Sequence, residues 1–259
     1  MKAACSPEMV AFANRLADAS GAVIRRYFRR PVEVDRKSDD SPVTEADREA
    51  ERAMRALIEE AFPGHGIMGE EHGDAHAGAE LVWVLDPIDG TQSFITGRPV
   101  FGTLIALVRR GRPILGVIDA PITGERWVGV AGRPSTLNDK PVRVRPCESL
   151  ERAVLYAPAP EYFTGADLEA YRRLRSRVGM PREGDDCYAY ALLAIGCVDL
   201  VVESDMQPHD FLALAPVIEG AGGIITDWRG APLTLGSDGR VLAAGDPAAH
   251  AAALARLAG

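Results

Sequence analysis

Two carboxylates follow directly after an apolar run in the stretch from Leu85 to Thr91, which reads LDPIDGT. The preceding run, Leu81 to Leu85, is short and rich in β-branched and aromatic residues, which predicts a buried strand. A proline restricts the backbone between the two acids, so Asp86 and Asp89 can lie on one side of a stiff turn, with the carbonyl of Ile88 between them. These hard oxygen atoms are typical ligands of a divalent cation.

The end of the same stretch has residue types that favour an anion. Gly90 would let the backbone approach a ligand closely, and Thr91 can cap a following helical turn whose exposed N–H groups attract a phosphate. The combination predicts a cation site beside a phosphate site. The structural alternative is an Asp-Pro turn followed by an Asp-Gly turn, which surface loops often contain.

Two adjacent acids, Glu70 and Glu71, occupy an earlier strand end or turn. Adjacent side chains on an extended segment point to opposite faces, so only one of the two should reach a shared site. We expect Glu70 to be that residue, with Glu71 second. His72 has the chemistry of a metal ligand, although a loop histidine beside a glycine is more often solvated.

Two further acids lie where helices are predicted to begin. Asp47 follows Thr44 at the distance of a capping box, and it could also hold a metal-bound water; the two roles are compatible. Pro208 begins another helix, and Asp210 lies in its first turn, where the helix dipole favours a carboxylate. If this acid shares a pocket with the three predicted above, the four carboxylates would repel one another and require bound cations. Hard oxygen ligands select Mg²⁺ over zinc or copper.

The composition limits the class of protein. The chain has 259 residues, 47% of them hydrophobic, enough for one large domain or two subdomains with a sizeable core. Its 29 Lys and Arg residues against 37 Asp and Glu residues give a formal charge of -8, which argues against a nucleic acid partner and suits metal ions. We expect no membrane partner and a cytoplasmic location, because apolar runs are too short for a span and the N-terminal segment is charged. The four cysteines lack metal-type spacing and should be reduced and packed as small apolar groups.

The periodicity of apolar residues differs between the two halves of the chain. Helices are predicted over residues 8–28 and 44–62, an exposed loop over 74–80, and strands over 81–85, 100–108, 113–119, 125–130 and 142–144. Later strands are predicted at 153–156, 198–202, 223–226 and 241–244, with helices at 167–178, 187–195, 211–220 and 247–257. We therefore predict an α+β subdomain over residues 1–147, with a mostly antiparallel sheet and most of the metal ligands. A smaller α/β subdomain over residues 148–259 would carry the last ligand and the substrate wall.

Several of these motifs together resemble the inositol monophosphatase superfamily, the lithium-sensitive, Mg²⁺-dependent phosphatases. The resemblance rests on Gly69-Glu70-Glu71, on WVLDPIDGT from Trp83, on Val43-Thr44-x-x-Asp47, and on Asp210 followed by EGAGG from Glu219. The segments SFITGRP from Ser93 and FGTLIAL from Phe101 look most like the histidinol-phosphate phosphatase branch. The resemblance implies a layered α-β-α-β-α sandwich and a homodimer.

The resemblance also implies a ligand set for two to three Mg²⁺ ions. The first ion would be held by Glu70, Asp86 and the carbonyl of Ile88. A second would share Asp86 and add Asp89 and Asp210, and a third, weaker ion would lie near Glu70.

Catalytic and substrate-binding residues are implied in the same way. Glu70, Thr91 and Asp47 form the catalytic set, in which Thr91 and Asp47 resemble the pair that orients the attacking water. The amides of Gly90 and Thr91 would hold phosphate oxygens. Glu203 falls where family members contact the leaving-group alcohol, beside Asp210, and Asp186 is placed to help it.

Acidic residues at the leaving-group side suit an amine-bearing phosphorylated substrate such as L-histidinol phosphate. The alternative for Asp186 and Glu203 is ordinary pairing with arginines. Two positions depart from the family: His209 stands where a Trp or Tyr is usual, and His72 replaces the Ser of the inositol branch.

The resemblance implies a histidinol-phosphatase of histidine biosynthesis. Alternatives are an inositol-1-monophosphatase or broad sugar-phosphate phosphatase, and a non-catalytic regulator associated with RNA or transcription.

Overall fold

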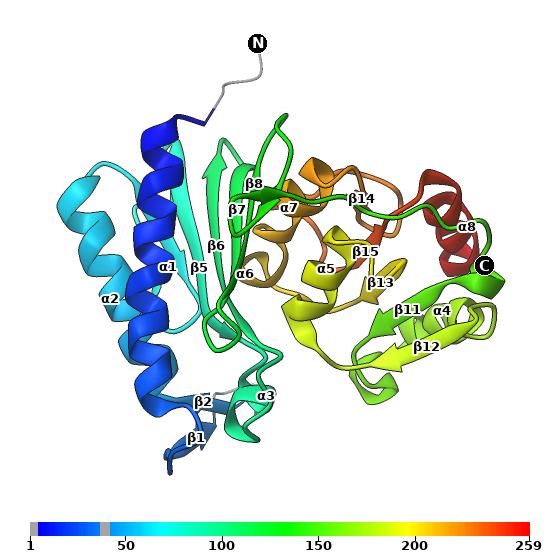
Figure 1. The fold of residues 1–259 in the computed structure, drawn as a ribbon, viewed down its shortest axis with the longest axis horizontal. Coiled ribbons are helices and arrows are strands. Elements are labelled where there is room, and N and C mark those ends of the chain that lie inside the picture. Colours follow the sequence, from blue (N-terminus) through cyan, green and yellow to red (C-terminus); the bar gives the residue numbers. More distant parts are fainter. Residues whose placement is uncertain (1–4, 37–41) are drawn as a thin grey trace.

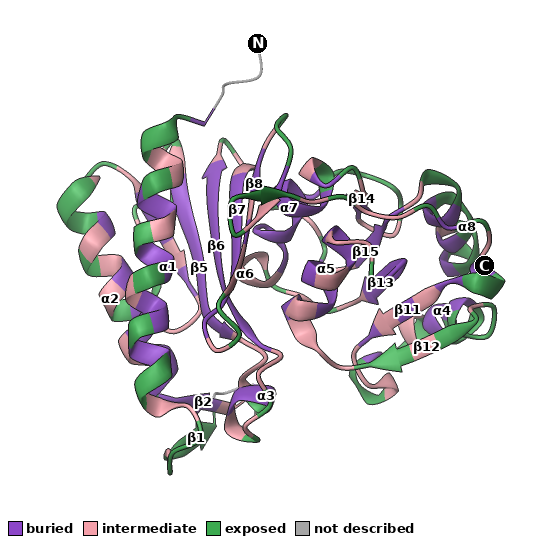
Figure 2. Cartoon of the chain, viewed as in Figure 1, coloured by how far each residue is buried: buried purple, intermediate pink, exposed green. Residues whose placement is uncertain are grey.

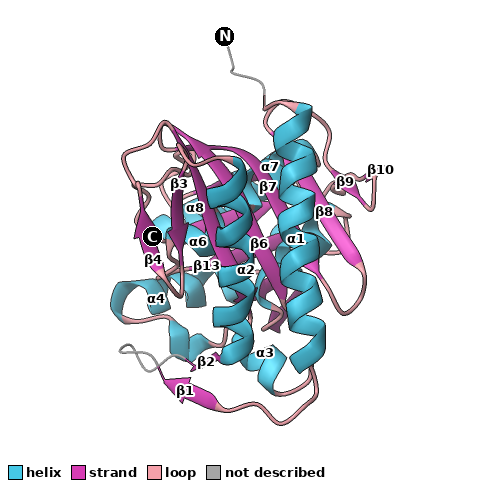
Figure 3. Ribbon diagram, turned by 90° about the vertical axis from the view of Figure 1, so that its left-hand side faces the viewer, coloured by secondary structure: helices cyan, strands magenta, loops and turns pink. Residues whose placement is uncertain are grey.

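Helices and β-sheets alternate in layers in the computed structural model, which describes residues 5–36 and 42–259 (Figure 1). Helices α1 (Pro7–Tyr27) and α2 (Glu45–Ala61) lie side by side on one face of an eight-stranded sheet (Figure 3). A middle layer of α5 (Asp186–Ala194), α6 (Pro208–Phe211) and α7 (Leu214–Gly220) separates this sheet from a five-stranded one. The far face of the second sheet carries α4 (Gly165–Arg175) and α8 (Pro247–Ala258), so the predicted α-β-α-β-α sandwich is confirmed.

The eight-stranded sheet has the order β10-β9-β8-β7-β6-β5-β3-β4. Its neighbouring strands are antiparallel except β3 and β5, which are parallel, so the mostly antiparallel first sheet is as expected. The strands are β3 (Gly66–Gly69), β4 (Gly73–Ala75), β5 (Leu81–Asp89), β6 (Gly102–Arg109), β7 (Arg112–Ala120), β8 (Glu125–Val130), β9 (Thr136–Leu137) and β10 (Lys140–Pro141).

The central strands of this sheet are buried on both faces (Figure 2). Trp83 and Leu85 of β5 pack in the core beneath α1 and α2. Val82 and Val84 point to the other face and pack with residues of α5 and α7. A strand covered on both sides needs apolar residues at every position, which explains the continuous run before the acids.

The five-stranded sheet has the order β12-β11-β13-β15-β14 and mixes directions. Strand β11 is parallel to β12 and β13, whereas β15 is antiparallel to β13 and β14. The strands are β11 (Val154–Ala157), β12 (Met180–Glu183), β13 (Leu200–Glu203), β14 (Ile224–Thr226) and β15 (Val241–Ala244). The division into subdomains at residues 147 and 148 remains our proposal.

Several predicted elements differ in the structure. Strand β4 lies partly within the predicted 74–80 loop because it pairs with β3, and β12 pairs with β11 although it was not predicted. Residues 142–144 are not in a strand, and the helix expected over 211–220 is divided into α6 and α7. Cys197 is exposed, contrary to expectation, whereas the other three cysteines are buried as free thiols.

A short antiparallel pair, β1 (Val34–Arg36) and β2 (Pro42–Thr44), connects α1 to α2. Lys37, in the charged segment between these two strands that we expected to approach the acidic residues, is outside the described residues. In the part of the chain that the structure describes, we find no helix with the length and apolar character of a membrane span.

Candidate active site

Three carboxylates meet where the end of β5 contacts α6 of the middle helical layer. Asp86 and Asp89 come from the end of β5, and Asp210 comes from the first turn of α6. One carboxylate oxygen from each lies within 4.8 Å of the other two. The structure therefore brings together acids that are far apart in the sequence, as predicted.

Strand β5 continues through Asp89, so the stiff turn predicted after Leu85 is wrong. The register shifts instead: Asp86 pairs with Leu104 and Asp89 with Gly102, so two residues of β5 lie opposite one residue of β6. This is a β-bulge, which redirects side chains near the end of a strand. The bulge allows both carboxylates to face the same side.

Burial, followed by repulsion from neighbouring acids, dominates the electrostatics of Asp86 and Asp89. Burial raises the pKa of Asp86 well above its usual value, and the charges of Glu70, Asp89 and Asp210 raise it further. Burial also raises the pKa of Asp89, followed by the charges of Asp186 and Asp210. Oδ1 of Asp86 is buried and has no hydrogen-bond partner among the described residues. An all-oxygen donor set with a buried, unsatisfied carboxylate oxygen fits a hard divalent cation.

The charge of Glu70 raises the pKa of Asp86 further, after burial as the main cause. The backbone amide of Glu70 donates to the carbonyl of Leu85 over 3.2 Å, which holds the turn after β3 against β5. The charges of Glu71 and Glu70 both raise the pKa of Asp47, although burial is the main cause. That only Glu70 of the two reaches the shared site stays a prediction.

Glu51 is a positioning residue that the sequence analysis missed. It is fully buried on α2 and accepts hydrogen bonds from the amides of Glu71 (2.7 Å) and His72 (3.1 Å). Its carboxylate also accepts from Arg55 over 2.7 Å. These contacts fix the turn that carries Glu70. A signal was present, since Glu51 falls on the apolar face of α2 that a helical repeat predicts to be buried.

Asp47 has the predicted capping role, and it also lies next to Thr91. Its Oδ2 accepts from the amide (2.9 Å) and hydroxyl (2.6 Å) of Thr44, which completes the predicted capping box. Its Oδ1 lies 3.5 Å from the hydroxyl of Thr91, which also donates to the carbonyl of Ile88 over 3.1 Å. Burial raises the pKa of Asp47 to about 6, although the hydrogen bonds from Thr44 act to lower this pKa.

Gly90 rather than Thr91 is the N-cap of the short helix α3 (Thr91–Ile95), so the predicted capping role of Thr91 is wrong. Gly90 has a φ of 93°, a left-handed conformation that glycine adopts without strain. A Cβ at this position would lie 2.6 Å from Oδ2 of Asp186. Both the conformation and the close approach of Asp186 therefore require glycine here.

Asp186 and Glu203, the two acids expected to form a substrate wall, lie close to each other. Both line a small cavity of about 10 Å³ near α5. Asp186 accepts from the hydroxyl of Ser93 over 3.2 Å. Burial raises the pKa of Glu203 to about 8, and the charge of Asp186 adds to this effect.

The alternative for Asp186 and Glu203 is an ion pair with an arginine. The nearby arginine instead pairs with Asp185, the residue before Asp186. Arg98 forms its ion pair with Asp185 over 2.9 Å. Its charge also lowers the pKa of Asp186, but burial still raises that pKa overall. Burial and the charges of Asp186 and Asp210 raise the pKa of Glu203, whereas a hydrogen bond with the hydroxyl of Tyr190 lowers it. No arginine of the described residues is among these causes.

The two histidines singled out in the sequence lie at different distances from the acids. The ring of His72 is exposed, and its Nε2 lies 3.1 Å from the carbonyl of Arg48, so it is not directed at the acids. His209 contacts the site, because its Nε2 lies 3.3 Å from Oδ1 of Asp210. The departure at position 209 therefore places a nitrogen next to one of the three acids.

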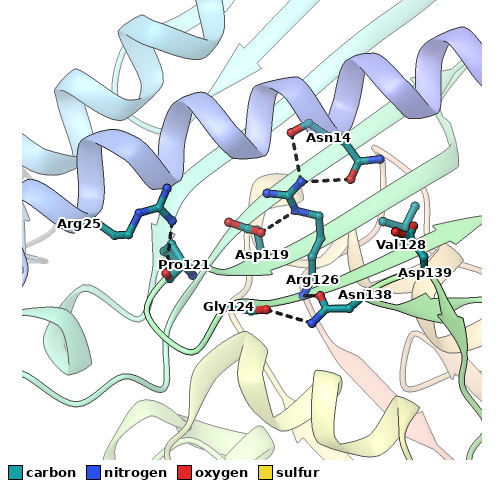
Figure 4. A pocket seen from close by; sticks show the side chains of 9 residues that line it. All are labelled: Asn14, Arg25, Asp119, Pro121, Gly124, Arg126, Val128, Asn138 and Asp139. Carbon is teal, nitrogen blue, oxygen red and sulfur yellow. Dashed lines mark hydrogen bonds and ion pairs between the residues drawn. The ribbon is translucent and has the colours of Figure 1, made fainter.

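A separate cavity of about 340 Å³ lies between α1 and the β7–β8 hairpin (Figure 4). Its Arg126 already donates to Asp119 (2.6 Å), Asn14 (3.3 Å) and Asp18 (2.7 Å). Arg25, its other arginine, donates to a backbone carbonyl after β7 over 3.3 Å. Because both guanidinium groups already bind protein groups, we interpret the cavity as part of the packing between α1 and the sheet rather than as a ligand site.

Comparisons with known proteins agree with the geometry. The profile of the inositol monophosphatase family matches residues 6–258. The chain is 53% identical over 256 residues to "Bifunctional phosphatase IMPL2, chloroplastic" of Arabidopsis thaliana, with 95% of this chain and 74% of that protein covered. It is 37% identical over 233 residues to a histidinol-phosphatase of Chlorobaculum parvum, with 89% and 90% covered. The solved structure of an inositol monophosphatase from Zymomonas mobilis has a TM-score of 0.89 and 46% identity, with 98% of this chain and 100% of that chain covered. The chain therefore belongs to the inositol monophosphatase family, whose members are metal-dependent phosphatases.

Proposed function

We propose that this phosphatase is a histidinol-phosphatase, which hydrolyses L-histidinol phosphate to L-histidinol and phosphate in histidine biosynthesis. One observation carries the choice of substrate: Asp186 and Glu203 line one cavity beside the three clustered acids. An ammonium group next to this wall would favour the ionised form of Glu203, whose pKa is otherwise about 8, and would then form a charge-assisted hydrogen bond with it. The histidinol-phosphatase among the relatives supports the same choice.

In this proposal two to three Mg²⁺ ions bind to the acids at the end of β5. Glu70, Asp86 and the carbonyl of Ile88 would hold one ion, and Asp86, Asp89 and Asp210 a second. Bound Mg²⁺ supplies an acidified water and a positive charge for the leaving oxygen. The proposal is supported by the proximity of the carboxylates and by the unsatisfied Oδ1 of Asp86.

Thr91 and Asp47 would orient the attacking water. The hydroxyl proton of Thr91 points either to the Ile88 carbonyl (3.1 Å) or to Oδ1 of Asp47 (3.5 Å). In either case a lone pair of Thr91 Oγ1 remains to accept a hydrogen bond from a water. Asp47 is fixed by Thr44 and cannot turn away without losing its capping bonds. The amides of Gly90 and Thr91, at the start of α3, would hold phosphate oxygens.

An inositol-1-monophosphatase or a broader sugar-phosphate phosphatase is the second candidate, favoured by the similarity to the Zymomonas mobilis enzyme. Phosphate release from L-histidinol phosphate, inositol 1-phosphate and adenosine 3',5'-bisphosphate, each with and without chelator, tests both. We expect kcat/KM to be highest for L-histidinol phosphate and activity to disappear with chelator. A preference for inositol 1-phosphate would reject the first candidate, and activity in chelator would reject the metal site.

The remaining parts of the proposal concern the oligomeric state, inhibition by lithium and the cellular location. We infer a homodimer and inhibition by lithium from the family resemblance, and a cytoplasmic location as expected from the sequence. Sedimentation of the purified chain and a lithium titration of its activity test the first two.

A further inference from the structure

The bulge that directs Asp86 and Asp89 to one side contains a backbone carbonyl with a specific partner. Pro87 and Ile88 lie in the register shift of β5, opposite Thr103 of β6. The hydroxyl of Thr103 donates to the carbonyl of Pro87 over 2.8 Å. A carbonyl in a bulge loses its regular ladder partner, so this bond replaces one that the sheet does not provide.

A second hydroxyl supports the first. Oγ of Ser20, on α1, lies 2.9 Å from Oγ1 of Thr103. The proton of Thr103 is used for the Pro87 carbonyl, which can only accept, so Ser20 must donate to Thr103. Ser20 and Thr103 are both fully buried, so neither hydroxyl can exchange this partner for solvent. A chain of two hydrogen bonds therefore runs from α1 to the bulge.

We propose that Thr103, supported by Ser20, is a positioning residue that fixes the peptide between Pro87 and Ile88 and so sets the geometry of the cation site. This inference rests on the proposed metal site. The same peptide joins the bonded Pro87 carbonyl to Ile88, whose own carbonyl is a proposed ligand. Without the Thr103 hydroxyl, the buried Pro87 carbonyl is unsatisfied, and rotation of the peptide would relieve that cost. Rotation would displace the Ile88 carbonyl and change the direction of the chain into Asp89.

Other contacts hold α1 in place above the two hydrogen bonds that link Ser20, Thr103 and Pro87. Asp119 pairs with Thr103 across β6 and β7 and is bound to Arg126, which also contacts Asn14 on α1 (Figure 4). Position 20 on α1 is therefore held over β6 by contacts that do not involve the cation site. A change at Thr103 should thus act locally on the bulge.

The test compares T103V, which removes the hydroxyl at nearly constant volume, with T103S, which keeps it. Mg²⁺ binding to the metal-free protein is measured by titration calorimetry and by the rise in Tm on adding Mg²⁺. We expect T103V to weaken Mg²⁺ binding by about tenfold, as loss of outer-shell partners does in metal sites. T103S should bind within about twofold of wild type, and S20A should fall between T103V and wild type.

Equal Mg²⁺ affinity of T103V and wild type would overturn the proposal, even if T103V lowers the Tm of the metal-free protein. Equal weakening by T103S and T103V would also overturn it, because the methyl group rather than the hydroxyl would then matter. If T103V does not fold, S20A decides: unchanged Mg²⁺ affinity in S20A overturns the proposal. Absence of Mg²⁺ binding in the wild-type protein would instead reject the proposed metal site itself.

Discussion

The backbone amide of Cys187 donates a hydrogen bond to Oδ2 of Asp89 over 2.5 Å. Asp89 ends β5 of the first sheet, whereas Cys187 lies in the first turn of α5, directly after Asp186. One oxygen of a proposed metal ligand thus fixes the helix that carries Asp186, a residue of the proposed substrate wall. The position of Asp186 and the position of the cation site are therefore linked through a single hydrogen bond.

Replacement of Asp86 by Asn should abolish turnover and preserve the fold. An amide lacks the charge of the carboxylate and is a poorer ligand, so we expect kcat to fall by at least about 10³-fold, near the upper range for loss of one electrostatic group. The Tm of the metal-free variant should not fall, because burial and three neighbouring acids already disfavour the charged form of Asp86. Steady-state kinetics over a wide range of Mg²⁺ concentrations and thermal melts measure both effects.

The exposed acid Asp74, changed to Asn, is the matched control and should leave both quantities unchanged. Activity of D86N that returns in excess Mg²⁺ would contradict the assignment of this ligand.

Replacement of Glu203 by Gln should change specificity more than chemistry. Charge-assisted hydrogen bonds contribute about 1.5–3 kcal/mol, so KM for L-histidinol phosphate should rise by about tenfold or more. KM for inositol 1-phosphate, which has no ammonium group, should change by less than about twofold. Kinetics with both substrates, and with E161Q as an exposed control, measure this. An equal rise in KM for both substrates would argue against recognition of an amine by Glu203.

Part of this organisation could be predicted from the sequence because it is local. The capping box of Thr44 and Asp47 depends on residues within one helical turn, and its spacing is sufficient to predict it. The convergence of Asp210 with Asp86 depends on how α6 packs against β5, which is a contact between distant parts of the sequence, so it needed the family resemblance. Glu51 was missed although its place on the apolar face of α2 was visible.

The bulge could not be predicted from β5 alone. Its register depends on pairing with β6, and the partner of the Pro87 carbonyl is a threonine from that strand. The sequence around Asp86 predicts a break in regular structure, and a turn satisfies that pattern as well as a bulge does. For the same reason β12 was missed, since its strand character comes from pairing with β11.

The Arg98–Asp185 ion pair should raise substrate affinity, because it holds the backbone segment that positions Asp186. Gly184, Asp185 and Asp186 have successive φ values of 94°, 73° and 42°, and the two aspartates are in a conformation unfavourable for side chains with a Cβ. The pair, at 2.9 Å, holds this strained segment against the loop after α3. We expect R98M to raise KM for L-histidinol phosphate by up to about fivefold with kcat retained, since a partly exposed pair contributes about 0.2–1 kcal/mol.

D185N is the conservative control, because Asn tolerates a positive φ and can still accept from the guanidinium. It should lie closer to wild type than R98M does. A fall in kcat without a change in KM for R98M would contradict a positioning role at the substrate wall.

His250 should make the stability of the fold sensitive to acid. Its ring lies in α8 with Nε2 2.9 Å from Oγ1 of Thr226, whose own proton is donated to the carbonyl of Asp227. Nε2 must therefore carry the proton donated to Thr226, and burial lowers the pKa of His250. The unfolded chain takes up a proton near pH 6.5, whereas the folded chain resists it, so the stability contributed by neutral His250 is present above about pH 6.5 and is lost as pH falls below it.

Thermal melts should show the Tm of wild type falling more than that of H250Q between pH 7 and pH 5, by about 1–2 °C. The exposed His76, changed to Gln, should melt as wild type does across this range. Parallel Tm curves for wild type and H250Q would show that protonation of His250 does not oppose folding.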